Sequence, residues 1–161
     1  MAVPQIRLAE AGDLLAMSDV IERQLRKHVL RNASREAAQP MLASASVEGL
    51  QRHIADGYQY HVLAAGADVY GVVGMKPPCH LYHLFVADVM QRQGWGRKLW
   101  NAARDGVCLQ HSVPPVFTVN ATPNAVPFYR ALGFDITGDA QEQQGVSYQP
   151  MRYVMLGARL K

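Results

Sequence analysis

Residues 84–99 have the sequence LFVADVMQRQGWGRKL, and most of the fold prediction rests on them. Residues 84–86 are the last three of the apolar run 80–86, which predicts a strand. Residues 95–99 begin an amphipathic helix that is expected to run from about Trp95 to Gln110. Gly94 and Gly96 lie between the two elements, where backbone N–H groups can approach a ligand without a Cβ in the way. This order predicts an anion-binding turn, because N–H groups at a helix N-terminus attract negative charge.

Three basic residues support this prediction. Arg92, Arg97 and Lys98 lie at the N-terminal end of the helix, where the helix dipole alone favours acidic residues. The alternative is a turn with two glycines beside a solvated basic face. The segment matches neither G-x-x-x-x-G-K-[ST] nor G-x-G-x-x-G, so it does not predict binding of a nucleoside triphosphate or NAD.

The whole sequence, residues 1–161, predicts one mixed α/β domain. Asp13 is the predicted N-cap of the first helix, and Ser46 opens the second. Residues 31–45 are Ala-rich, contain Pro40 and predict no clear element. Helices are expected at about 13–30, 46–57, 95–110 and 124–132, and strands at 5–8, 58–65, 69–75, 80–86, 116–120, 134–137 and 146–160. A polar loop at 139–145 joins the last two strands.

The composition excludes several classes of function. Hydrophobic residues make up 49% and charged residues 18%, and the net charge is only +3. The basic residues are scattered and form no Lys/Arg-rich run, so neither a nucleic-acid nor a membrane partner is expected. Neither a signal peptide nor a membrane-spanning run is found, so a cytoplasmic protein is expected. Cys79 and Cys108 lack metal-ligand spacing, so no metal is expected.

A second segment, residues 119–134, has the sequence VNATPNAVPFYRALGF. It places the carboxamides of Asn120 and Asn124 at the end of a strand and Tyr129 on a short helix. Gly133 supplies the helix stop. Packing beside Phe128 is the alternative to a chemical role for Tyr129.

Together the two segments resemble the GNAT superfamily of acetyltransferases. Gln91-x-x-Gly94-x-Gly96, after a strand that ends Leu-Phe-Val, resembles the family's motif A, which binds the pyrophosphate of acetyl-CoA. Ala125-x-x-Phe128-Tyr129-x-x-Leu132-Gly133-Phe134 resembles its motif B. The matches cover roughly residues 80–135. The resemblance implies an α/β fold with a central mixed, mostly antiparallel sheet of about seven strands flanked by about four helices.

The resemblance also implies a cofactor site for acetyl-CoA. The backbone of Leu84, Phe85 and Val86 would bind the pantetheine arm and the thioester oxygen, and Asn120 and Asn124 would contact the pantetheine. Many members carry an asparagine where this chain has Thr122, so the chain departs from the family pattern there. The side chain of Trp95 is expected to pack into the core. The pyrophosphate loop would comprise Gln91, Arg92, Gln93, Gly94, Trp95, Gly96, Arg97 and Lys98.

Two catalytic residues follow from the resemblance. Tyr129 would be the general acid that protonates the leaving thiolate. His80 stands eleven residues before Gln91, where histone-acetylating members carry a glutamate, and would be the general base. On a regular strand His80, Tyr82, Leu84 and Val86 share a face and His83 lies on the other. The alternative for His80 is an exposed residue at the start of a strand.

The predicted function is transfer of the acetyl group of acetyl-CoA to a primary amine of a small molecule or peptide, by direct attack in a ternary complex. Polar and aromatic residues of the first helices and the second strand favour an acceptor with a carboxylate over a polycation; they are His28, Arg31, Asn32, Arg35, Tyr58 and Tyr60. A non-catalytic acyl-CoA sensor is the alternative function. The sequence leaves a homodimer open.

Overall fold

The computed structural model describes residues 2–110, 116–143 and 145–155, and in these ranges it has one mixed sheet. The strands are β1 (Gln5–Leu8), β2 (Gln59–Ala65), β3 (Asp68–Lys76), β4 (His80–Val86), β5 (Val116–Ala121), β6 (Asp135–Ile136), β7 (Gln141–Gln143) and β8 (Val146–Val154). Their order is β1-β2-β3-β4-β5-β8-β6, and β7 pairs with β8. All described pairs are antiparallel except β4 with β5. The predicted fold class is confirmed, with eight strands instead of seven because β7 forms in the predicted polar loop.

The described α-helices are α1 (Leu14–Gln24), α2 (Arg35–Ala45), α3 (Val47–Ala55), α4 (Trp95–Cys108) and α5 (Val126–Leu132). The π-turn η2 (Leu25–Val29) extends α1, which accounts for the predicted helix end near Leu30. Helix α2 lies in the segment for which the sequence predicted no element. The Ser34 hydroxyl caps it by accepting a hydrogen bond from the Ala37 N–H at 3.1 Å, and the helix continues through Pro40. None of the described helices is long and apolar enough to cross a bilayer.

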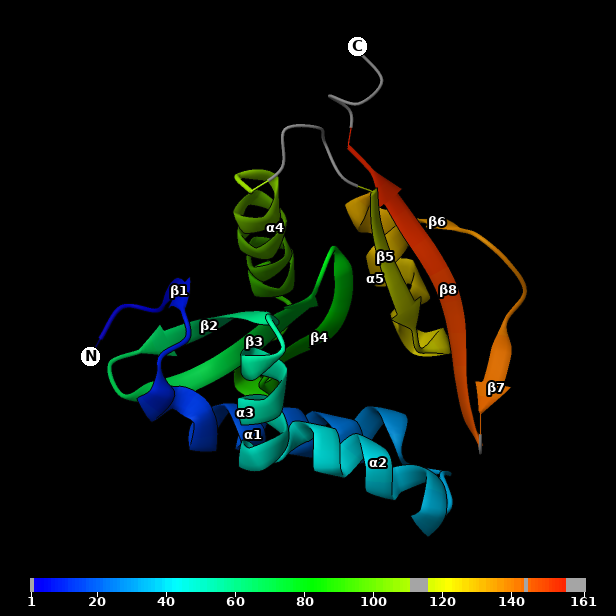
Figure 1. The fold of residues 1–161 in the computed structure, drawn as a ribbon, viewed down its shortest axis with the longest axis horizontal. Coiled ribbons are helices and arrows are strands. Elements are labelled where there is room, and N and C mark those ends of the chain that lie inside the picture. Colours follow the sequence, from blue (N-terminus) through cyan, green and yellow to red (C-terminus); the bar gives the residue numbers. More distant parts are fainter. Residues whose placement is uncertain (1, 111–115, 144, 156–161) are drawn as a thin grey trace.

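Two hydrophobic cores lie on opposite faces of the sheet (Figure 1). Helix α4 covers one face with the buried Leu99, Trp100 and Ala103, and α5 joins the same core. Helices α1, α2 and α3 cover the other face, where Met17, Ile21 and Leu50 are fully buried. Helix α4 is amphipathic, as predicted, and its apolar face packs against the sheet.

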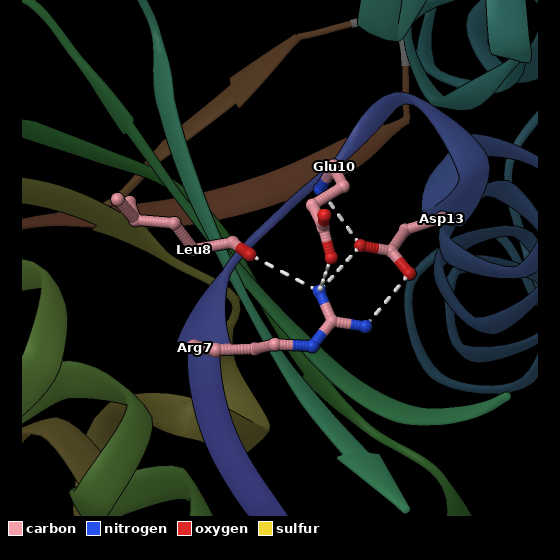
Figure 2. A network of polar contacts seen from close by, with 4 residues as sticks. All are labelled: Arg7, Leu8, Glu10 and Asp13. Atoms are coloured by element: carbon pink, nitrogen blue, oxygen red, sulfur yellow. Dashed lines mark hydrogen bonds and ion pairs between the residues drawn. The ribbon is translucent and has the colours of Figure 1, made fainter. Parts of the chain in front are cut away.

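Asp13 connects β1 to α1 and is the N-cap residue of α1, as predicted, but its side chain makes no capping hydrogen bond to that helix. Its carboxylate faces back toward the strand and binds the Arg7 guanidinium through two contacts of 2.7 and 3.0 Å (Figure 2). It also accepts a hydrogen bond from the Glu10 backbone N–H at 2.7 Å. The guanidinium holds the pKa of Asp13 below its usual value. The carboxylate therefore fixes the turn before α1 and leaves the first turn of α1 without a side-chain cap.

Strands β4 and β5 pair over only two residues, at the start of β4 and the middle of β5. His80 lies opposite Thr118 and Leu81 opposite Val119, and no further pair joins the two described strands. Beyond these residues the strands diverge, as Figure 1 shows for the green β4 and the yellow β5. Because parallel strands normally continue their hydrogen-bond ladder, the divergence leaves one backbone edge of β4 without a strand partner.

Candidate functional site

Two adjoining cavities lie where β4 and β5 diverge. The β4–β5 cavity, of about 470 Å³, lies between β4, β5, the end of α1 and the start of α5. The loop cavity, of about 480 Å³, lies between α5 and the loop at residues 90–97. The two cavities form one continuous space, because they share six lining residues: Leu84, Val86, Gln91, Ala125, Phe128 and Tyr129.

The loop before α4 has the backbone of an anion site. Arg92 has φ 64° and Gly94 has φ 84°, so both adopt the left-handed conformation that favours glycine. Gly94 is the N-cap of α4, and the first turn of that helix contains no acidic residue. Arg92, Gly94, Gly96 and Arg97 line the loop cavity. The Arg97 guanidinium also donates to the Ala131 carbonyl oxygen at 3.1 Å. The N-terminus of α4 and two arginines therefore lie at the loop cavity, where both favour a bound anion.

Hydrogen bonds of the Gln91 side chain hold this loop in place. Its amide donates to the Val86 carbonyl oxygen at 2.8 Å, which ties the loop to the end of β4. The same amide nitrogen donates to the Gln24 side-chain oxygen at 3.2 Å, which ties the loop to α1. Gln91 thus lines the space where both cavities meet and fixes its wall.

Three predicted loop residues have other contacts. The Gln93 side chain donates to the Val89 carbonyl oxygen at 3.3 Å, and the Lys98 ammonium lies 4.5 Å from the centre of the Trp95 ring. Neither Gln93 nor Lys98 lines the loop cavity, so any contact of theirs with a ligand there remains a prediction. Trp95 packs against the core under α4, as expected, and also lines the loop cavity.

Tyr129 lies where the two cavities meet. Its side chain is 7% exposed and packs between Phe128 and Phe134, whose ring centres lie 5.2 and 5.4 Å away. Burial raises the pKa of the Tyr129 hydroxyl, so the group is protonated at neutral pH and can donate a proton. Its packing contacts and its place on the cavity wall are both observed, so the two sequence interpretations are compatible.

A β-bulge changes the faces predicted for β4. Gly74 pairs with His83 and the next residue, Met75, pairs with Leu81, so β4 has one extra residue, Tyr82. Tyr82 and His83 therefore lie on the same side of the sheet, with ring centres 4.6 Å apart.

The prediction that His80 and Tyr82 share a face with Leu84 and Val86 is therefore wrong, whereas His83 does lie on the face opposite Leu84 and Val86. Tyr82 contacts Ser44 of α2 through a 2.7 Å hydrogen bond, whereas Leu84 and Val86 pack against the core under α4. In a regular strand successive side chains point to opposite faces of the sheet. The extra residue at the bulge shifts this alternation by one, so the residues before it change face relative to those after it.

His80 lies outside both cavities. It is not among their lining residues, and its Nδ1 atom lies 2.7 Å from the Thr118 hydroxyl of β5. Burial lowers the pKa of His80, which favours the neutral ring. The shared face that suggested its role as general base does not exist, so that role remains an untested prediction.

Asn120 and Asn124 line the β4–β5 cavity but not the loop cavity. Phe85 also lines the β4–β5 cavity, and it packs with the core under α1 instead of the core under α4. The Thr122 hydroxyl donates to the Asn124 side-chain oxygen at 2.7 Å. The Thr122 departure from the family pattern therefore has a local function, because it orients the neighbouring carboxamide.

Sequence reasoning missed Gln24. This glutamine is 6% exposed and donates to the Asp88 carboxylate at 3.0 Å in addition to accepting from Gln91. It follows Met17 and Ile21 at helical spacing on the buried face of α1. A buried polar side chain needs a hydrogen-bond partner. The place of a glutamine on the apolar face of the helix is therefore the sequence pattern that could have indicated its role. The described residues contain no group of three His, Cys, Asp or Glu side chains that could hold a metal ion.

Comparisons with known proteins agree with this geometry. Residues 29–155 match the family model described as "Acetyltransferase (GNAT) domain". The structure is similar to the PaiA N-acetyltransferase of Thermoplasma acidophilum in complex with coenzyme A, with a TM-score of 0.79, 14% identity and coverage of 95% of this chain and 99% of that one. It is also similar to the ribosomal-protein-alanine N-acetyltransferase of Brucella melitensis, with a TM-score of 0.70, 18% identity and coverage of 94% and 99%. No curated protein matches the chain in sequence. The family match, the diverging β4 and β5 and the glycine loop before α4 together show that this chain belongs to the GNAT acetyltransferase family.

Proposed function

We propose that this protein is an N-acetyltransferase that moves the acetyl group of acetyl-CoA to a primary amine of a small molecule or peptide. One observation carries the proposal: the loop cavity and the β4–β5 cavity meet at Tyr129. A cofactor that enters from one side and an acceptor that enters from the other would meet beside this hydroxyl. Direct transfer in a ternary complex needs such a meeting point.

In this proposal the pyrophosphate of acetyl-CoA binds the N–H groups of the loop at Gly94 and Gly96, assisted by Arg92 and Arg97. The pantetheine arm then runs along the backbone edge of β4 at 84–86, where β5 has diverged. That edge offers N–H and C=O groups that need hydrogen-bond partners. The residues of the loop and the strand edge therefore fit an elongated ligand with an anionic end, as acetyl-CoA is.

The reaction follows from this placement. The amine nitrogen attacks the thioester carbon, and N–H groups of β4 stabilise the developing oxyanion, an effect of roughly 3–4 kcal/mol per donor in other acyl-transfer sites. The C–S bond then breaks, and Tyr129 gives its proton to the leaving sulfur. The proton that the nitrogen loses restores the Tyr129 hydroxyl by way of solvent. No covalent intermediate with the protein is required.

The acceptor must be neutral to attack, and the cavity itself favours the neutral form. None of the described residues that line the β4–β5 cavity is Asp or Glu. An ammonium that enters it loses hydration without gaining a counter-charge, which lowers the pKa of the amine. In this proposal the amine loses its proton to solvent at the cavity mouth, and the role of His80 as general base stays a separate prediction.

The test is calorimetric titration with acetyl-CoA, followed by a panel of primary amines with detection of released thiol. The thiols of Cys79 and Cys108 give a background that a sample without amine measures. Binding together with amine-dependent thiol release is the expected result. Binding without release across the panel would instead favour an acyl-CoA sensor, and an absence of binding would overturn both functions.

A further inference from the structure

We propose that the acceptor amine carries an anionic group, a carboxylate or phosphate, which binds at the outer end of the β4–β5 cavity beside Arg31, His28 and Asn124. This inference rests on the transferase function proposed above and names its substrate class.

The proposed subsite is a third cavity, the outer cavity, of about 350 Å³. It shares His28, Val29, Thr122 and Asn124 with the β4–β5 cavity, so the two are continuous. The π-turn η2 forms one wall and the start of η4 (Pro123–Ala125) contributes to the other. An acceptor that is long enough can therefore place its amine at Tyr129 and its far end in the outer cavity.

The charged side chains that line the β4–β5 cavity and the outer cavity are all basic. Lys27, His28 and Arg31 line the outer cavity, and none of the described lining residues of either cavity is Asp or Glu. The Lys27 ammonium is already 2.6 Å from the Asp88 carboxylate, which offsets its charge. Arg31 has no ion pair with any described side chain. Arg31 is therefore the main cation available to a ligand.

The charges around Arg31 add to this field. Arg31 also lines a neighbouring cavity together with Arg26 and Arg35. Two acids lie near that group in the chain. Glu22 is bound to Arg26 at 3.0 Å, and Glu36, next to Arg35, lines neither this cavity nor the outer cavity. A ligand with a second ammonium group would meet like charge here, whereas an anionic group would be attracted.

The opposite wall supplies a hydrogen-bond donor with a fixed direction. The side-chain oxygen of Asn124 accepts the Thr122 hydroxyl proton at 2.7 Å. This bond leaves the two N–H groups of the carboxamide for a ligand. A carboxylate or phosphate oxygen between Asn124 and Arg31 would then accept both a neutral and a charge-assisted hydrogen bond.

The experiment compares acceptors that share one alkylamine and differ only at the far end: a carboxylate, a phosphate, a carboxamide and a second amine. We expect kcat/KM for an anionic acceptor to exceed that for the carboxamide by about tenfold, the size of a charge-assisted hydrogen bond. Arg31→Gln should reduce this ratio to about twofold without changing kcat/KM for the carboxamide. The anionic group that the subsite prefers is the one, carboxylate or phosphate, whose acceptor shows the larger ratio of kcat/KM to that of the carboxamide.

Arg52→Gln is the matched control, because Arg52 is an exposed arginine of α3 that lines neither the outer cavity nor the β4–β5 cavity. It should preserve the ratio. An equal kcat/KM for anionic and carboxamide acceptors, or an equal loss for all acceptors in Arg31→Gln, would overturn the inference. Turnover that favours the diamine would overturn it while leaving the transferase function intact.

If no acceptor turns over, that result counts against the transferase function alone. A binding measurement then still tests the anionic subsite. In the presence of CoA, calorimetry compares the N-acetylated carboxylate or phosphate with the N-acetylated carboxamide. The anionic compound should bind about tenfold more tightly, and only to the protein with Arg31. Equal affinity in this measurement would reject the subsite.

Discussion

The side-chain amide of Gln91 donates a hydrogen bond to the side-chain oxygen of Gln24, with 3.2 Å between nitrogen and oxygen. Gln24 ends α1 and lines the β4–β5 cavity, whereas Gln91 belongs to the loop that lines both cavities. Gln24 in turn donates to Asp88, whose carboxylate also binds Lys27. The wall of the proposed acceptor site and the wall of the proposed cofactor site are therefore one hydrogen-bonded unit.

Gln24→Leu should disturb both sites at once. The substitution removes the bonds to Asp88 and Gln91 and leaves the loop held by fewer contacts. We expect a loss of about 1–2 kcal/mol in the free energy of unfolding. The KM for acetyl-CoA should rise by about threefold or more, because the loop loses part of its support. Thermal unfolding and initial rates measure the two effects. Gln51→Leu, at an exposed glutamine of α3, is the control and should change neither.

Gly94→Val should weaken acetyl-CoA binding by about tenfold or more. Gly94 has φ 84°, and a Cβ there meets no atom within 4 Å, so the valine side chain would extend into open space beside the loop cavity. Backbone strain adds a stability loss of about 1–2 kcal/mol. Calorimetric affinity for acetyl-CoA is the measurement. Gly66→Val is the control for strain, since Gly66 has φ 64° in the turn between β2 and β3 and lines neither cavity. Undiminished affinity in Gly94→Val would mean that the pyrophosphate binds elsewhere.

Local sequence patterns were sufficient for much of this fold. The apolar run of β4, the glycines of the loop and the start of α4 were placed correctly, because each depends on neighbouring residues alone. The Ser46 cap of α3 was predicted for the same reason, and its hydroxyl accepts the Gly49 N–H at 3.0 Å. The part of the last predicted strand at 156–160 lies outside the described residues.

Features that depend on distant contacts were not predictable in this way. The extra residue Tyr82 reverses the faces of β4, and only pairing with β3 reveals it. Helix α2 has a weak apolar pattern and contains Pro40, and it packs into the core under α1 through Ala45, Met41 and Leu42. The β4–β5 cavity, which Asn124 lines, forms from four separate segments of the chain, so its shape was not predictable from local patterns. The contact of Asn124 with pantetheine stays a prediction.

Tyr129→Phe should separate catalysis from binding. The phenylalanine retains the packing against Phe128 and Phe134 but cannot protonate the leaving thiolate. We expect kcat to fall by about 10²–10⁴-fold, the usual range for a positioned acid, while the affinity for acetyl-CoA stays within about twofold. Rapid-quench turnover and calorimetry measure the two quantities. Tyr153→Phe, at a core tyrosine that lines neither cavity, should retain kcat. An unchanged kcat in Tyr129→Phe would remove Tyr129 from the mechanism.

His83 should make the protein less stable in mild acid. Its ring is buried against α3, and its Nδ1 atom lies 3.0 Å from the Tyr60 hydroxyl. Burial, followed by the charge of His53, lowers the pKa of His83 to about 3 from the usual 6.5. Between these two values the unfolded chain binds a proton that the folded protein does not bind. The free energy of unfolding should therefore fall by up to about 1.4 kcal/mol per pH unit as the pH decreases from about 6.5 toward 3.

Urea unfolding at pH 7 and pH 5 measures this effect. His83 alone should lower the free energy of unfolding by about 2 kcal/mol between pH 7 and pH 5. Burial also lowers the pKa values of His53 and His61, so both add to this decrease with the same sign. His83→Gln should therefore show a smaller decrease than the wild type. Ile21→Val, in the core under α1, costs about 0.5–1.5 kcal/mol without removing a titrating group, so it should keep the full decrease. If His83→Gln and Ile21→Val show the same dependence on pH, protonation of His83 does not limit stability, and the histidine must be charged or exposed in the folded protein.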